Sequence, residues 1–260
     1  MPELVNWTIH PNGTAALTLR RPEAANALSI ELLHTLAEGI EALASQPDVR
    51  CVVLTGEGHK AFCAGADLKE RAQMTPSETK DTVALIGSVV NQLADMPQPT
   101  LAVLNGSAFG GGLELALACD IRMAADHIKI GLTETSLGVI PGAGGTQRLP
   151  RIIGTAKAKE LIFTAKKIDT AEALSIGLLE HVVPSERLPE KIAEMTDAIC
   201  RNAPIAVRQA KAAVTNGTDA GLEAGLLIEQ QAYEATLFTE DRLEGLNAFR
   251  EKRLPVYKGR

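Results

Sequence analysis

Aromatic residues are scarce in this chain, and no excess of positive charge is present. Phe, Tyr and Trp make up 3% of the residues and hydrophobic residues as a whole 45%, so the core must be built from Ala, Val, Ile and Leu. The formal net charge of -6 argues against nucleic acid or an anionic membrane as the main partner. A chain of 260 residues suffices for one large domain, with or without a small appendage.

Closely spaced cysteines are also missing. None of the four cysteines lies within four residues of another, which excludes a CxxC-type zinc or redox pair. We therefore expect no metal site. Cys51 and Cys119 lie in or beside apolar runs and are expected to be small buried hydrophobes.

Signals for export or membrane insertion are not recognisable either. The first ten residues, MPELVNWTIH, contain neither a basic segment nor an apolar one, so they do not resemble a secretory signal. No uncharged apolar run reaches the 18 residues of a membrane-spanning helix. We expect a reduced, cytoplasmic setting and no membrane partner.

Residues 1–185 alternate between strand and helix patterns. Apolar runs predict strands over 14–20, 51–56, 100–106, 121–126 and 128–132. Amphipathic patterns predict helices over about 30–45 and 78–95. A helix opened by glycines is predicted over 110–120, and two further helices, TQRLPRIIG and TAKAKELIFTA, over 146–165. Ser29 is expected to cap the helix over 30–45. This alternation predicts an α/β core with mostly parallel strands.

Residues 186–260 carry only helical patterns, with breaks expected near Ala203-Pro204, Asn216-Gly217 and Thr239. The sequence therefore predicts two domains, an α/β core over 1–185 and a helical region over 186–260. The helix expected over 221–238 has apolar residues on more than one face. This pattern is typical of a helix that packs against a neighbouring subunit, and also of a helix in a large monomeric core.

Three loops are rich in small residues: CAGAD (63–67), GSAFGGG (106–112) and PGAGG (141–145). None is a nucleotide motif, because Gly112 stands where a P-loop needs lysine and Gln147 where the dinucleotide fingerprint needs its third glycine. Nucleotide cleavage and hydride transfer therefore lose support. The first loop leaves two interpretations open: Cys63 is a nucleophile, or small side chains expose backbone N–H groups there.

The glycine run before residue 113 opens a predicted helix. The first four N–H groups of a helix lack internal partners, and the helix dipole adds partial positive charge at that end. Glycines let a ligand approach those N–H groups, which could stabilise an oxyanion by roughly 3 kcal/mol per donor. The glycines are equally compatible with tight packing between helix and strand.

Two glutamates are candidate acid/base residues. Glu114 lies in GGGLELALACD, among Gly, Leu and Ala, and a lone carboxylate on such a helix is rarely buried without a partner or a task. Burial raises the pKa of a carboxyl and a helix N-terminus lowers it. Glu134 follows an apolar strand, where sites often lie in α/β folds. Taken alone, Glu134 also fits a solvated loop residue.

The motifs together resemble the crotonase (enoyl-CoA hydratase/isomerase) superfamily over nearly the whole chain. The resemblance rests on RRPEAANALS (20–29), AFCAGADLKE (61–70), NGSAFGGGLELALACDIR (105–122), GVIPGAGGTQRL (138–149) and EGLNAFREKR (244–253). It implies an α/β fold built as a spiral of β-β-α units, with a C-terminal all-helical trimerisation region. It also implies a homo-oligomer, either a trimer or a dimer of trimers.

Site residues follow from the same resemblance. Ala64 and Gly111 would donate the two N–H groups of an oxyanion hole, and Glu114 and Glu134 match the glutamate pair of family hydratases. Coenzyme A would contact Ala25, Ala27, Ala66, Asp67, Leu68, Phe249 and Lys252, the last two from a neighbouring subunit. Coenzyme A is then part of the substrate, and no separate cofactor or metal is implied.

The resemblance implies an enoyl-CoA hydratase, a hydro-lyase of fatty acid or branched-chain amino acid degradation. Glu114 would activate water and Glu134 would supply the proton to Cα. One alternative is an enoyl-CoA isomerase of the same fold, and the resemblance implies that many such isomerases keep a single acid/base residue. The other alternative is an RNA-binding protein with vestigial catalysis.

Within the superfamily the chain most resembles the AU-RNA-binding methylglutaconyl-CoA hydratase branch, through the stretches CAGADLKER, GLELALACDIR, GTQRLPR, AKELIF and DRLEGL. By that resemblance, the RNA-binding members carry lysines on the first long helix and the turn before it. The corresponding stretch here, AANALSIELLHTLAEGIEAL, has no lysine and carries Glu31, Glu38 and Glu41, so nothing there can neutralise phosphates. We therefore expect no nucleic acid partner.

Overall fold

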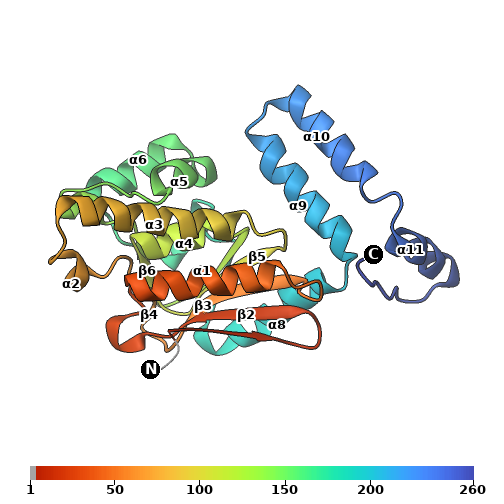
Figure 1. Cartoon of the computed structure of the whole chain (residues 1–260), viewed down its shortest axis with the longest axis horizontal. Coiled ribbons are helices and arrows are strands. Elements are labelled where there is room, and N and C mark those ends of the chain that lie inside the picture. Colours follow the sequence, from red (N-terminus) through yellow and green to blue (C-terminus); the bar gives the residue numbers. More distant parts are fainter. Residues whose placement is uncertain (1–3) are drawn as a thin grey trace.

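The computed structural model describes residues 4–260 (Figure 1). Residues 1–3 of the predicted first domain lie outside the described part. In residues 4–260 the larger sheet has the strand order β1-β2-β3-β5-β7-β10 and the smaller one β4-β6-β8-β9. The larger sheet contains β1 (Val5–Ile9), β2 (Thr14–Leu19), β3 (Cys51–Gly56), β5 (Thr100–Leu104), β7 (Ile121–Ala125) and β10 (His181–Val183). The smaller sheet contains β4 (Ala61–Cys63), β6 (Ser107–Phe109), β8 (Lys129–Gly131) and β9 (Ile168–Asp169).

Helices cover these sheets and continue beyond them. The α-helices of the core are α1 (Ile30–Ala44), α2 (Leu68–Arg71), α3 (Pro76–Ala94), α4 (Gly111–Ala118), α5 (Gly145–Ile153), α6 (Thr155–Thr164) and α7 (Thr170–Ser175). Those of the C-terminal region are α8 (Leu188–Cys200), α9 (Pro204–Thr218), α10 (Leu222–Glu234) and α11 (Glu240–Glu251). Short 3-10 helices are η1 (Pro22–Ala24), η2 (Glu134–Leu137) and η3 (Ser185–Arg187). Within residues 4–260 no helix is both long and apolar enough to span a bilayer.

From β3 to β8, consecutive strands alternate between the two sheets. β3, β5 and β7 run parallel in the larger sheet, while β4, β6 and β8, which follow them in the chain, run parallel in the smaller one. Helices α2 and α3 follow the first strand pair, α4 follows the second and α5 the third. The chain thus advances by β-β-α units, which confirms the predicted spiral and its helical C-terminal region.

Helix α1 shows how sequence pattern becomes packing. The Ser29 side chain accepts a hydrogen bond from the Leu32 N–H and so caps the helix, as the sequence predicts. The apolar face is buried, and its side chains are Leu32, Leu33, Leu36, Ile40 and Leu43. Burial of one such side chain contributes about 1.5–3 kcal/mol to folding, so this face fixes α1 on the sheet.

Short strands and one helix end differ from the predictions. The predictions omit β1, β4, β6, β9 and β10, and β4 and β6 span only three residues each, too few for a periodic pattern. The break predicted near Asn216-Gly217 lies slightly later, over residues 219–221, because α9 continues to Thr218 and α10 begins at Leu222. A Cβ at Gly217 would lie 3.4 Å from the Gly225 Cα of α10, so this glycine serves the close approach of two helices.

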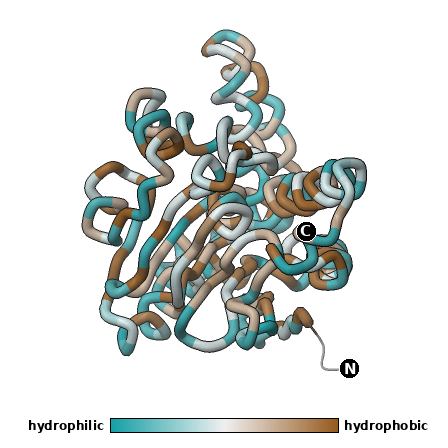
Figure 2. Tube along the Cα trace, turned by 90° about the vertical axis from the view of Figure 1, so that its left-hand side faces the viewer, coloured by the Kyte–Doolittle hydropathy of each residue, from teal (hydrophilic) through white to brown (hydrophobic). Residues whose placement is uncertain are grey.

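The C-terminal helices extend away from the core. Figure 1 shows α9 and α10 as a hairpin that projects from the sheets, with α11 beside the C-terminus. Two contacts fix the base of the hairpin: Lys211 pairs with Asp120 at 2.8 Å, and the Arg208 guanidinium donates to the Val49 carbonyl at 3.0 Å. Apolar segments mark this hairpin, at the top of Figure 2. Leu222, Leu226 and Leu227 of α10 are exposed apolar side chains on this hairpin.

The close packing of α4 against β4 predicts a sharp response to one added methyl group. A Cβ at Gly112 would lie within 3.0 Å of the Cys63 carbonyl oxygen, whereas the nearest atom to a Cβ at Gly87 in α3 is 3.9 Å away. Gly112→Ala should therefore lower the free energy of unfolding by about 1–3 kcal/mol. Gly87→Ala should raise it by up to about 1 kcal/mol, because alanine favours a helix. Urea unfolding of both variants measures this, and equal effects would contradict the packing described.

Candidate active site

The loops that follow three parallel strands meet at one edge of the smaller sheet. In β4, β6 and β8, Cys63 lies opposite Ala108 and Phe109 opposite Gly131. The carboxyl ends of parallel strands lie at the same edge, so the residues after them are neighbours. These residues are the loop 64–67, the glycines that open α4 and the start of η2. The register therefore brings three distant parts of the sequence together.

Two adjoining backbone N–H groups on residues that line a cavity at this edge have no acceptor among residues 4–260. They belong to Ala66 and to Gly111, the first residue of α4. A Cβ at Gly111 would lie 3.8 Å from the Ala66 nitrogen, so the two groups adjoin. The prediction for Ala64 is corrected by this structure, because its N–H already donates to the Ala25 carbonyl at 3.0 Å. Ala66, predicted only as a coenzyme A contact, has a free N–H instead.

Gly65 makes this arrangement sterically possible. Its φ of +91° lies in the region that favours glycine. A Cβ there would come to 2.7 Å from the Phe109 carbonyl oxygen and to 3.1 Å from the Gly111 nitrogen. Any larger residue would push the loop away from α4, so Gly65 sets the spacing between the two free N–H groups.

Glu114 is buried on α4 and held by a second loop. Its Oε1 accepts hydrogen bonds from the N–H groups of Ala143 at 2.7 Å and Gly145 at 2.8 Å. Burial raises the pKa of this carboxyl, while the two hydrogen bonds and the nearby Arg148 charge oppose the rise. The sequence identifies Glu114 but not these supports. The start of α5 at Gly145 was the available signal, since helix N-termini carry free donors.

Glu134 begins η2 and lies beside α4. A Cβ at Gly110 would come to 3.1 Å from Glu134 Oε1. Glu134 Oε2 is buried and has no hydrogen-bond partner among the described residues. Burial, reinforced by the Glu114 charge, raises the pKa of this carboxyl to about 7, although its own N–H and the Arg71 charge oppose the rise. The structure thus places two carboxyl groups with raised pKa values close to each other.

A cavity of about 110 Å³ contains this constellation. Both glutamates line it, and so do the residues of both free N–H groups. Most of the remaining wall is apolar, formed by Leu68, Val83, Ile86, Leu137, Val139, Ile140 and Ala143. The cavity therefore combines free backbone N–H groups and two titratable groups inside an apolar wall, which makes it the candidate acid/base active site.

Residues predicted to contact coenzyme A lie around the same loop. Ala25 accepts the N–H of Ala64, and the buried Ala27 accepts from Arg21 at 3.2 Å through its carbonyl. Asp67 caps α2 and pairs with Arg21 at 2.7 Å, so its carboxylate is already engaged. Leu68 is 56% exposed at the cavity mouth. These contacts to coenzyme A stay predictions.

Phe249 and Lys252 lie on and just after α11 and do not line the cavity of their own chain. Phe249 is 87% exposed. Their predicted contact is with a neighbouring subunit, and it stays a prediction.

Cys63 and the other cysteines are buried free thiols. Burial raises the pKa of Cys63 to about 12, so its thiol stays protonated at neutral pH. Cys63 is also absent from the residues that line the cavity. Between the two interpretations of the first loop, the structure favours exposed backbone over a nucleophilic thiol. Among the described residues no group of three or more His, Cys, Asp or Glu side chains is placed to hold a metal ion.

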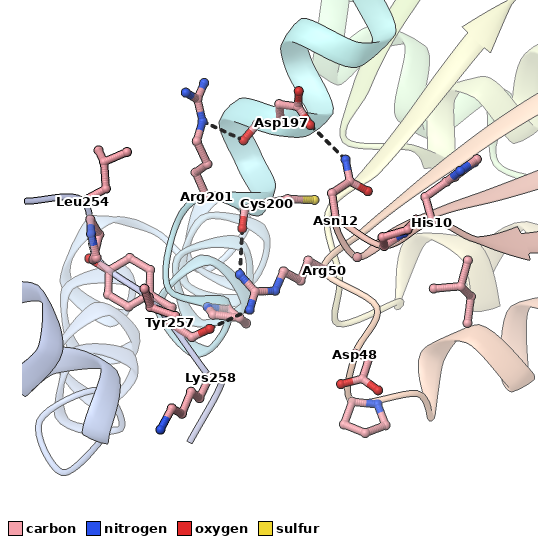
Figure 3. A pocket seen from close by; sticks show the side chains of 17 residues that line it. His10, Asn12, Asp48, Arg50, Asp197, Cys200, Arg201, Leu254, Tyr257 and Lys258 are labelled. Carbon is pink, nitrogen blue, oxygen red and sulfur yellow. Dashed lines mark hydrogen bonds between the residues drawn. The ribbon is translucent and has the colours of Figure 1, made fainter.

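A second, wider cavity of about 670 Å³ lies between the turn before β2 and the C-terminal tail (Figure 3). Arg50 donates there to the carbonyl oxygens of Cys200 at 2.8 Å and Tyr257 at 2.7 Å. Asn12 donates to Asp197 at 2.9 Å across the same groove. The predicted catalytic residues do not line it. Its polar groups join the tail to the core.

Comparison with known proteins decides the family. A profile described as enoyl-CoA hydratase/isomerase matches residues 10–260. The chain belongs to the enoyl-CoA hydratase/isomerase family. The predicted family, the fold and the class of hydro-lyase enzyme are thereby confirmed.

Individual relatives agree with this membership. The chain is 52% identical over 259 residues to YngF of Bacillus subtilis, which is named for the same family, and the match covers all of both chains. It is 48% identical over 251 residues to mitochondrial methylglutaconyl-CoA hydratase of Mus musculus, covering 95% of this chain and 80% of that one. The crystal structure of an enoyl-CoA hydratase from Bacillus anthracis matches with a TM-score of 0.97 at 49% identity, covering 99% of this chain and 100% of that one.

The raised pKa of Glu134 predicts a pH-dependent cost in stability. The folded protein holds this proton up to about pH 7, whereas the unfolded chain releases it near the ordinary value of 4.5. The stability that proton binding contributes is therefore present below pH 4.5 and is lost as the pH rises to about 7. Glu134→Gln avoids this loss, so its melting temperature should exceed that of the wild type by more at pH 8 than at pH 5. Glu38→Gln, at an exposed position of α1, is the control. A difference in melting temperature between Glu134→Gln and the wild type that shrinks with rising pH would contradict the raised pKa of Glu134.

Proposed function

We propose that this chain is an enoyl-CoA hydratase that adds water across the 2,3 double bond of a 2-enoyl-CoA thioester to give a 3-hydroxyacyl-CoA. One observation carries the proposal: two carboxyl groups with raised pKa values face the same small cavity as two unpaired backbone N–H groups. Coenzyme A belongs to the substrate, and the proposed chemistry needs no separate cofactor.

The N–H groups of Ala66 and Gly111 would bind the thioester oxygen. When water adds at Cβ of a conjugated thioester, negative charge develops on that oxygen. Donors already in place stabilise this charge where it forms, by about 3 kcal/mol for each donor. The rigid spacing set by Gly65 means that little reorganisation is needed during the reaction.

The environments of the two glutamates suggest different roles. Glu114 accepts hydrogen bonds from two backbone N–H groups and lies near the positive charge of Arg148. These hydrogen bonds and this charge favour the ionised form of Glu114. It would take a proton from the attacking water. Glu134 has a buried, unpartnered oxygen and a pKa of about 7, so it would deliver a proton to Cα. An isomerase that moves one proton needs only one such group, and the pair therefore supports hydration over the isomerase alternative.

The acyl group we propose is short and branched, of the methylglutaconyl type. The support is the similarity to proteins named methylglutaconyl-CoA hydratase, at 48% identity in Mus musculus and 47% in Homo sapiens. With such a substrate, the proposed role is in branched-chain amino acid degradation rather than in the handling of long fatty acyl chains.

We also propose that copies of the chain assemble into a trimer or a dimer of trimers through the C-terminal helices. Exposed apolar side chains support this, namely Leu222, Leu226, Leu227, Tyr233, Phe238, Leu243, Leu246 and Phe249. Such a surface on a projecting hairpin is typical of a subunit interface.

Each glutamate should contribute separately to kcat for hydration. Glu114→Gln and Glu134→Gln should each lower kcat for crotonyl-CoA by about 10²–10⁴-fold, because each removes one proton-transfer group. The dissociation constant for a saturated ester such as butyryl-CoA, measured by calorimetry, should stay within about threefold, because binding does not need the proton transfer.

Cys63→Ala is the control, since Cys63 ends β4 directly before the loop 64–67 but does not line the cavity. Its kcat should equal that of the wild type. Full turnover in either glutamine variant would contradict the mechanism. Loss of turnover in a correctly folded Cys63→Ala protein would point back to a thiol nucleophile.

A further inference from the structure

One basic side chain lines the catalytic cavity and has no partner. Arg71, the last residue of α2, is half-buried and is the only Lys, Arg or His among the described residues that form the cavity wall. Its guanidinium makes no hydrogen bond or ion pair with any side chain or carbonyl of residues 4–260. Other arginines around the site are engaged, such as Arg21 with Asp67 and Arg148 with Asn91.

The direction of Arg71 follows from the helix that carries it. Leu68 and Arg71 are three residues apart, so they lie on the same face of α2, and both line the cavity. Lys69 lies between them, is exposed and is not part of the wall. The Arg71 charge also reaches Glu134, whose pKa it lowers. These observations place the guanidinium on the side of the cavity that holds Glu134.

A free guanidinium in such a wall calls for an anion. Desolvating a charge without a partner is costly, and arginine forms bidentate, charge-assisted hydrogen bonds with carboxylates. The rest of the wall offers no anion for it except the two glutamates, neither of which pairs with it. A substrate bound at the free N–H groups would extend its acyl chain into the same cavity.

We propose that Arg71 is a specificity-determining residue that binds a terminal carboxylate on the acyl chain of the substrate. The proposal rests on the proposed hydration of enoyl-CoA thioesters and names the substrate class, namely 2-enoyl-CoA esters whose acyl chain ends in a carboxylate. Such a substrate would bring a third negative charge close to Glu114 and Glu134. Arg71 offsets that repulsion, and a cavity without it would exclude the same acyl group.

The test compares two substrates that differ by one carboxylate, 3-methylglutaconyl-CoA and 3-methylcrotonyl-CoA. The measured quantity is the ratio of kcat/KM for the first to kcat/KM for the second. In Arg71→Gln this ratio should fall by about 10- to 100-fold, the loss expected for a hydrogen bond between charged groups. Arg71→Lys keeps the positive charge but loses the bidentate geometry of the guanidinium. Its ratio should therefore lie between that of Arg71→Gln and that of the wild type. Lys69→Gln, the adjacent basic residue outside the wall, should leave the ratio within about twofold.

A ratio keeps other effects of Arg71 apart from specificity. The Arg71 charge also lowers the pKa of Glu134, so removing it shifts the pH dependence of kcat/KM for both substrates in the same way. The ratio of the two kcat/KM values cancels that shift. An equal loss for both substrates in Arg71→Gln would overturn the proposal and assign Arg71 to Glu134 or to the phosphates of coenzyme A. A wild type that hydrates only 3-methylcrotonyl-CoA would overturn it while leaving hydration intact. A wild type that hydrates neither substrate, nor crotonyl-CoA, would overturn the proposed function itself.

Discussion

The parallel register of β4, β6 and β8 is the constraint on which the rest of the site depends. It places the ends of three short strands at one edge, so loops about 45 and 20 residues apart in sequence become neighbours. Close approach at that edge is possible only because Gly65 and Gly112 have no side chains. The larger sheet and α1 contribute many of the buried apolar side chains of the core, which keeps this edge in place. The polar groups of the site lie at that edge.

The second feature is the cost of holding two carboxyl groups in an apolar cavity. The protein limits that cost for Glu114 through two backbone N–H groups and leaves Glu134 with one oxygen unpartnered. The unequal support separates the two groups in their affinity for a proton. That difference supports the proposed division of labour between base and acid. Among the described residues Arg71 is the one basic side chain in the cavity wall, and in our proposal it links this electrostatic balance to the choice of substrate.

Much of this could be predicted from the sequence. Long periodic elements such as α1 and β3 follow from their apolar spacing, and Glu114 stands out because a carboxylate is rare on such a helix. The short strands could not be predicted, since three residues carry no period. The N–H donor could not be assigned correctly either: Ala64 and Ala66 are alike in sequence, and only the hydrogen bond from Ala64 to Ala25 distinguishes them. Side-chain identity does not encode which backbone groups stay free.

The central claim is that a protonated Glu134 and an ionised Glu114 act together, and the pH dependence of kcat/KM for crotonyl-CoA tests it most directly. This quantity reports the titration of groups in the free enzyme. With a pKa of about 7 for Glu134, kcat/KM should fall as the pH rises through about 7, because the acid loses its proton. At low pH it should fall again as Glu114 becomes protonated. A value of kcat/KM that stays constant from about pH 6 to pH 9 would contradict the account.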